Sequence, residues 1–140
     1  MPTYAQILAG LTTALQTGTG LDTNRVLDFE PTAADDQPLI YSLFVRYEKT
    51  SQGQLDKHLF RVLHRVVVTW QDNEGAERLL VPFLESIPAA INSNPRLGGL
   101  LVNGYADISE ADGVFVMIGG VLCRGYDFIS ESFYKQGRTP

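Results

Sequence analysis

The sequence predicts a single α+β domain over residues 1–140, with a mixed, mainly antiparallel sheet, an N-terminal helix and a second, kinked helix packed on the sheet. Three observations predict this class. Apolar residues recur at helical spacing near the N-terminus and again over residues 80–91, alternating patterns typical of strands occupy residues 39–70, and strand-like runs resume after residue 99. A chain of 140 residues is long enough for one proper core and too short to favour two domains.

Thr3 is expected to begin the first helix. It precedes Gln6 by three residues, which is the spacing of a capping box. The apolar residues that follow recur every three or four positions and fall on one face of a helix: Tyr4, Leu8, Leu11 and Leu15. Gly18 and Gly20 supply the backbone freedom that the end of this helix and the next turn require.

Residues 25–29 form a short strand candidate, and the acidic, proline-bounded segment 31–38 is predicted to be a surface loop. Residues 39–48 follow as a half-buried strand whose inward positions are odd-numbered: Leu39, Tyr41, Leu43, Val45 and Tyr47. In residues 57–70 the inward positions are even-numbered instead: Phe60, Val62, Val66, Val68 and Trp70. The two strands are expected to form a long antiparallel hairpin, whose polar tip at residues 50–54 is longer than a two-residue turn requires.

Asp72 and Asn73 can cap a second helix, and its apolar stripe has helical spacing: Leu80, Phe83, Leu84, Ile87 and Ile91. Pro82 and Pro88 interrupt it, so we expect a kink or two short helical pieces.

The remaining residues are predicted to form strands 101–109 and 114–118, joined by a turn at residues 111–113. A bend at Gly119 and Gly120 then leads to a last strand, 121–133, and residues 135–140 are expected to form a loose tail.

Composition limits the possible functions. The net charge of −5 disfavours simple nucleic-acid binding, and neither predicted helix carries a basic row, so a nucleic-acid regulator ranks last among the candidate functions. One cysteine excludes an intrachain disulfide, and two histidines provide no spaced set of zinc ligands. Because residues 1–4 do not begin a signal peptide and no apolar run approaches a membrane span, we expect a soluble protein in a reducing compartment with no membrane partner.

No catalytic signature is evident, and we predict a protein without enzymatic activity, cofactor or metal. His64 lies between apolar residues on its predicted strand and is expected to be a core or interface histidine, while Cys123 is expected to be a small buried hydrophobe. The pairs Gly98-Gly99 and Gly119-Gly120 lack the spacing of nucleotide-binding loops. Adjacent acids such as Asp35 and Asp36 are typical of solvated turns.

Arg61 and Arg65 lie on one face of their predicted strand and form a small basic stripe on an acidic protein. Two interpretations remain open. One is cross-strand pairing with Glu48 or another acid of the hairpin, and the other is a charged contact with a neighbouring subunit or with passing phosphate. We favour pairing within the protein or across an interface.

The order of these elements resembles that of the tail-terminator, or tail-completion, proteins of long-tailed bacteriophages. The resemblance covers most of the chain but rests on three short apolar motifs: Ile91-Asn92-Ser93-Asn94-Pro95 at a helix end, Arg96-Leu97-Gly98-Gly99-Leu100-Leu101, and Ile118-Gly119-Gly120-Val121. It implies a structural virion protein that forms a hexameric ring on the end of the tail tube, ends tube polymerisation and provides the surface for head attachment.

The resemblance further implies a location at the neck end of the tail, after assembly in the host cytoplasm. The implied partners are further copies of the chain, the tail-tube protein and a head connector or head-closure protein, with DNA passing through the lumen without specific binding. As a hypothesis, contacts with the tube or with neighbouring subunits come from the 30–38 loop, the tip of the hairpin and the basic stripe: Asp35, Asp36, Gln52, Gln54, Arg61 and Arg65.

Two alternatives accompany this interpretation. Another phage neck component, such as a head-closure or connector protein, shares the small size, the mixed sheet and the ring. A small enzyme or ligand-binding domain is less favoured, and its site would be built from Tyr41, His64, Trp70 and nearby acids.

Overall fold

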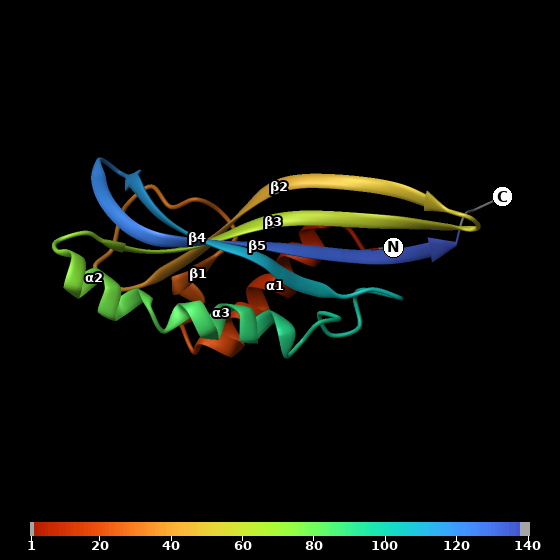
Figure 1. Cartoon of the computed structure of the whole chain (residues 1–140), viewed down its shortest axis with the longest axis horizontal. Coiled ribbons are helices and arrows are strands. Elements are labelled where there is room, and N and C mark those ends of the chain that lie inside the picture. Colours follow the sequence, from red (N-terminus) through yellow and green to blue (C-terminus); the bar gives the residue numbers. More distant parts are fainter. Residues whose placement is uncertain (1, 138–140) are drawn as a thin grey trace.

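The computed structural model describes residues 2–137, apart from the side chain of Gln52. Its helices lie together on one side of a single sheet, so the molecule has two layers (Figure 1). This architecture confirms the predicted α+β class. In chain order the elements are α1 (Tyr4–Thr19), a 3-10 turn (Thr23–Arg25), β1 (Val26–Leu27), β2 (Leu39–Gln52), β3 (Leu55–Thr69), α2 (Asn73–Leu80), α3 (Phe83–Asn92), β4 (Ala106–Ile118) and β5 (Val121–Gly137).

The strands are arranged in the order β1-β2-β3-β5-β4. The short β1 runs parallel to the start of β2, pairing with Ile40 and Tyr41, and all other neighbouring strands are antiparallel. β3 is flanked by β5 along its whole length and by β2 from residue 55 to residue 67. Within residues 2–137, the outer edge of β4 has no partner strand, and neither does that of β2 from residue 42 onward. The sheet therefore has two long open edges.

The predicted capping box begins α1. The Gln6 amide donates to the Thr3 hydroxyl, and the Thr3 amide donates to the side chain of Gln6. Two of the four predicted apolar positions, Leu11 and Leu15, are fully buried against the sheet, whereas Tyr4 and Leu8 pack at the margin of the core. Gly20 ends the helix in a left-handed conformation, with φ of 73°.

α1 lies against α3 at Gly18, where a Cβ atom would lie 2.2 Å from the Cβ of Ala90. Gly18→Ala is therefore expected to push the helices apart and to lower the free energy of unfolding by about 1–3 kcal/mol. Gly10→Ala, in the same helix, is the matched control. Its new Cβ meets only the Leu97 side chain, at 3.2 Å, so the helix propensity of alanine should offset the contact. Urea unfolding followed by circular dichroism measures both variants, and equal losses would contradict this account.

The second helix is kinked, as the prolines predict. α2 ends at Leu80 and α3 begins at Phe83, with a bend of 23° between them. Pro82 stands at the break, and Pro88 lies inside α3, where it has no amide to donate to the preceding turn. Asp72 caps α2 by accepting a hydrogen bond from the amide of Gly75. The buried residues of the two pieces pack on the sheet with α1: Ala76, Leu80, Phe83, Ile87, Ala90 and Ile91.

The prediction that the odd positions of β2 all face one core is wrong. A bulge at Val45 interrupts the pairing with β3 between Phe44 and Arg46. Before the bulge, even positions such as Ser42 face the helices and odd positions face the other side of the sheet. After it, odd positions such as Tyr47, which is paired with Phe60, face the helices. One inserted residue exchanges the two faces.

The odd positions before the bulge belong to a second, smaller core on the side away from the helices, formed by Leu39, Tyr41, Val67, Ile118 and Cys123. The loop at residues 28–38 covers this core, with Ala34 packed against it, and lies above the left end of the sheet in Figure 1. The backbone at Gly119 approaches this loop closely, because a Cβ there would lie 2.6 Å from the carbonyl oxygen of Thr32. Trp70, predicted to point inward, lies beyond β3 and is 38% exposed.

Three predicted turns differ in the structure. The β2–β3 tip is a two-residue turn at Gly53 and Gln54, because Gly53 supplies a φ of 62° and the strands pair up to residues 52 and 55. Residues 111–113 are not a turn but the middle of β4, held by pairing with β5. Gly119 and Gly120, both with positive φ, form the turn between β4 and β5 instead of a bend.

The C-terminal boundaries differ as well. Residues 101–105 are irregular, so β4 begins later than predicted, and β5 continues to Gly137 instead of ending at residue 133. The tail predicted for residues 135–140 is a strand as far as residue 137, and its remainder lies outside the described residues.

Candidate functional site

The sheet face away from the helices carries three ion pairs between strand residues, Arg46–Glu48, Arg61–Glu131 and Arg65–Asp127, and its half beyond the 28–38 loop is uncovered. We call this face of the sheet the open face. Position 61 of β3 lies on it, because the flanking residues Phe60 and Val62 are buried under the helices. The register then places the directly paired residues of the other strands on the same face.

One line of cross-strand partners on the open face is charged at every position, and we call it the charge row. Its members, in order from the β2 edge to the β4 edge, are Arg46, Arg61, Glu131 and Asp107. The signs are therefore two positive followed by two negative. In the middle of the row, an Arg61 guanidinium nitrogen lies 2.9 Å from a carboxylate oxygen of Glu131.

The two ends of the charge row face like charges inside the subunit. Arg46 is paired with Arg61, and Asp107 is paired with Glu131. Like charges directly opposite one another destabilise a sheet. Arg46 forms an ion pair within its own strand, with a guanidinium nitrogen 2.5 Å from a carboxylate oxygen of Glu48. Among residues 2–137, Asp107 has no basic group within ion-pair distance.

A second line of cross-strand partners on the open face also runs from basic residues near β2 to acidic residues at β4. Arg65 holds Asp127 with two hydrogen bonds, of 2.6 and 2.9 Å, and also donates to the Tyr41 hydroxyl at 3.1 Å. Both charged side chains are less than one-fifth exposed, and the hydrogen bonds to Asp127 raise the pKa of Arg65. Beyond them, Asp112 lies directly opposite Asp127 on β4, again acid against acid. The β4 edge is thus acidic in two lines.

Both predicted arginines therefore pair within the chain. Their partners are acids of β5, at the centre of the sheet, and not Glu48 as one interpretation suggested. The charges that remain exposed on the open face at its two edges are those of Arg46, Asp107, Glu110 and Asp112. Sequence reasoning did not place these residues at a sheet edge, because it expected a turn at residues 111–113, where Glu110 and Asp112 would be solvated acids, and could not foresee the register across four strands.

Asp35 and Asp36 belong to the 28–38 loop and have hydrogen-bond or ion-pair partners nearby. Asp35 accepts from the amide of Gln37 and lies 2.7 Å from Arg25, and these two contacts lower the pKa of its carboxyl group. Asp36 accepts a hydrogen bond from the Thr69 hydroxyl. These contacts attach the loop to the end of β3.

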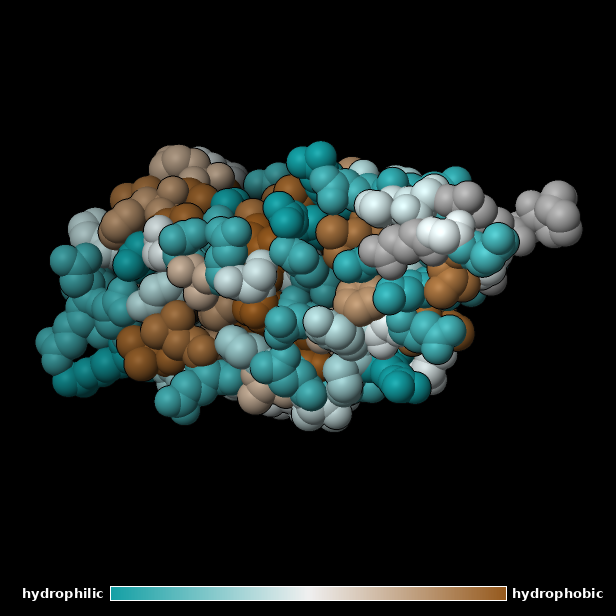
Figure 2. Space-filling view, turned by 45° about the vertical axis from the view of Figure 1, so that its right-hand side comes forward, coloured by the Kyte–Doolittle hydropathy of each residue, from teal (hydrophilic) through white to brown (hydrophobic). Residues whose placement is uncertain are grey.

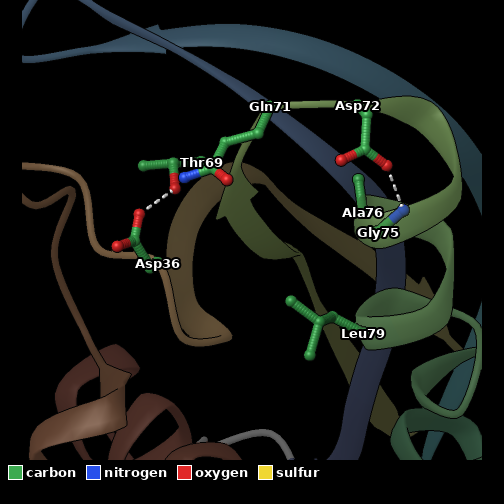
Figure 3. A pocket seen from close by; sticks show the side chains of 7 residues that line it. All are labelled: Asp36, Thr69, Gln71, Asp72, Gly75, Ala76 and Leu79. Carbon is green, nitrogen blue, oxygen red and sulfur yellow. Dashed lines mark hydrogen bonds between the residues drawn. The ribbon is translucent and has the colours of Figure 1, made fainter.

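Asp36 also lines a cavity of about 270 Å³ between this loop and the start of α2 (Figure 3). The cavity contains a second carboxylate, Asp72, which is occupied in capping α2 through Gly75, 2.6 Å away. The figure shows the two carboxylates on opposite walls, with Leu79 below them. In residues 2–137, no cluster of three or more metal-ligating side chains is present here or elsewhere.

Gln52 and Gln54, the last two of the predicted contact residues, belong to the β2–β3 tip. Gln54 lies in its two-residue turn, at the right-hand end of the sheet in Figure 1 and far from the 28–38 loop. The side chain of Gln52 lies outside the described part of the chain. The six predicted contact residues thus occupy three separate places, namely the two ends of the sheet and its open face.

His64 is completely buried under the helices. Its Nδ1 atom lies 2.7 Å from the Ser42 hydroxyl and its Nε2 atom 2.7 Å from the Ser130 hydroxyl. Burial lowers the pKa of His64 to about 4, so the ring is neutral at pH 7 and donates to one serine while accepting from the other. Tyr41 lies on the opposite face and Trp70 beyond the strand, so the structure does not assemble the alternative ligand site.

Apolar side chains gather around the β4–β5 turn, visible as brown at the upper left of Figure 2. The exposed members are Trp70, Phe115, Met117, Val121 and Leu122. Trp70 and Phe115 contact each other edge to face, at 6.5 Å between ring centres. This patch adjoins the end of the acidic β4 edge, so the edge is apolar at one end and charged at the other.

The sequence matches none of the models that describe known protein families, and no curated protein matches it. Within residues 2–137, none of the helices combines the length and apolar character of a membrane span. Function is therefore inferred from the residues and the geometry described above.

Proposed function

We propose that this protein is a structural subunit that forms a ring on the end of a bacteriophage tail tube. The ring ends polymerisation of the tube and provides the surface to which the head attaches. The single observation that carries the proposal is that one sheet has two long and unlike open edges, β2 and β4. A subunit with two different unpaired strand edges can join its copies head to tail. Such a contact closes into a ring when the rotation between neighbouring subunits returns to the first copy.

The charge of the protein suits a ring through which DNA passes. Six copies with a net charge of −5 carry about −30. On the open face Arg61 and Arg65 neutralise the β5 acids, so the acids left to repel the phosphate backbone and let DNA slide without binding are those of β4: Asp107, Glu110 and Asp112. The tail-tube protein below and a head connector or head-closure protein above are the remaining partners in this proposal.

The two-layer fold also suits a role that depends on surfaces. The buried His64 and its two serines, Ser42 and Ser130, satisfy one another by hydrogen bonds. The ring contacts and the exposed loops then carry the function, and no reacting side chain is required.

Electron microscopy of tails assembled with and without this protein tests the proposal. Tubes of uncontrolled, excessive length are expected without it, and purified protein added back should sit on the tube end. Tubes of normal length that still join heads in its absence would reject the proposal. Protein found on isolated heads and never on tubes would instead assign it to the head-closure or connector side of the neck.

A further inference from the structure

We propose that the β4 edge of one copy pairs antiparallel with the β2 edge of the next, and that Asp107 of the first copy forms an ion pair with Arg46 of the second. This inference rests on the proposed function, because it names the contact that closes the ring. It starts from the charge row, whose signs run from two positive at the β2 edge to two negative at the β4 edge.

The order of signs identifies the occupant of the edge as another copy of the chain. Placed side by side, two copies bring the negative end of one charge row against the positive end of the next. Asp107, which has no basic partner within residues 2–137 and faces Glu131, then meets Arg46, which faces Arg61. Each like-charge contact inside a subunit thereby gains an opposite charge across the boundary. An isologous contact, β4 against β4, would instead bring acids against acids.

The directions of the strands and the extents of their open edges fit the same contact. β2 and β4 run in opposite directions within one sheet, since three antiparallel steps separate them. A neighbouring copy in the same orientation therefore continues the antiparallel order without a break. At the register that places Asp107 opposite Arg46, residues 106–111 of β4 lie level with residues 47–42 of β2, so the paired stretch falls where both edges are strands and β1 leaves β2 open.

Both edges also carry one β-bulge, and the two bulges lie at neighbouring levels of the sheet. That of β2 lies between Phe44 and Arg46, and that of β4 lies between Ile108 and Glu110. Bulges and charged side chains are the features by which natural sheets prevent indiscriminate pairing of edges. These edges are thus protected from general aggregation while remaining complementary to each other.

Charge reversal at the two ends of the row is the primary test. Asp107→Arg places a positive group opposite Glu131, which should leave the monomer at least as stable as the wild type. Arg46→Asp places a negative group opposite Arg61 but loses the exposed contact with Glu48, which contributes little, so this monomer should also remain folded. Each single variant should raise the concentration for half assembly at least tenfold in sedimentation velocity. The double variant, with both signs exchanged, should restore assembly.

Glu85→Arg provides the matched control for Asp107→Arg, since it makes the same change in net charge on the exposed surface of α3, away from both edges, whereas Arg46→Asp changes the net charge by the same amount in the opposite direction. It should assemble like the wild type. Single reversals that assemble no worse than this control overturn the edge contact. If tails treated with those variants still end at normal length, the capping function stands and only this contact is wrong.

Cysteine pairs give a second measurement that does not depend on solution affinity, because it can be made on tail tubes. Arg46→Cys combined with Asp107→Cys should yield a ladder of covalent oligomers after oxidation, while an equal mixture of the two single variants should stop at dimers. A dimer from either single variant alone overturns the proposal by showing that like edges pair. Absence of the ladder both in solution and on capped tubes also overturns it, whereas a ladder formed by protein that never caps tubes supports the contact and rejects the tail function.

Discussion

Asp127→Ala is expected to lower the free energy of unfolding by roughly 2–3 kcal/mol. The substitution removes two charge-assisted hydrogen bonds from Arg65 and leaves its guanidinium, which is only 17% exposed, with the Tyr41 hydroxyl alone. Removing one partner of a buried ion pair costs about 3–5 kcal/mol, and the partial exposure of this pair places it at the low end. Relief of the repulsion from Asp112 returns about 0.2–1 kcal/mol.

Glu131→Ala is the control on the same strand and the same face. Its partner Arg61 is 38% exposed, so water replaces the lost interaction and the expected loss stays below about 1 kcal/mol. Urea unfolding at pH 7, followed by circular dichroism, measures both variants. Equal losses for the two would show that the burial of the Arg65 pair does not set its contribution.

Acidification is expected to destabilise the protein through His64. Burial holds the pKa of this histidine at about 4 in the folded protein, against 6.5 when it is exposed. Between these values the unfolded chain binds more protons than the folded one, so stability falls as the pH is lowered from 6.5 toward 4. The loss reaches roughly 3 kcal/mol at pH 4, and above about pH 7 His64 no longer contributes to the pH dependence of stability.

His64→Gln isolates this contribution, because glutamine can hydrogen-bond to the serines but does not titrate. The variant is expected to be less stable at pH 7 and to lose less stability between pH 6.5 and 4. Carboxylates such as Asp35, whose pKa is lowered, are common to both proteins and cancel in the comparison. Parallel curves of stability against pH for the two proteins would contradict a neutral, buried His64.

The parts of the fold that were predictable depend on neighbours in sequence. The capping box of Thr3 and Gln6, the proline break at Pro82 and the alternation of β3 are all decided within a few residues. Each gave the correct element. The class of the fold followed from them, since two helical stripes beside alternating strands pack as a layer on a sheet.

The errors arose where distant partners decide the local structure. Residues 111–113 have turn-forming chemistry, yet pairing with β5 holds them in the strand. The bulge at Val45 has no signal in the alternation of β2, since both faces of this strand are apolar where it is buried. Tertiary pairing outweighed local preference in both cases.

The candidate site was predictable only in part for the same reason. Arg61 and Arg65 stood out as a stripe because two residues of one strand suffice to define it. The two ends of the charge row, Arg46 and Asp107, come into line with Arg61 only through the pairing register of four strands. A pattern within one strand therefore revealed the centre of the row and not its ends.

The position of β5 between β3 and β4 governs how the chain reaches its native state. Leu55 pairs with Gly137 and Thr69 with Cys123, so the central strand completes its bonding only with the most distant segment of the chain. Closing such large loops is entropically costly, and topologies dominated by distant pairs fold slowly, in about milliseconds to seconds. A nascent chain therefore cannot complete the sheet until residues 121–137 have emerged from the ribosome, and β4, whose pairing in the sheet is with β5, is held as an edge only after that step.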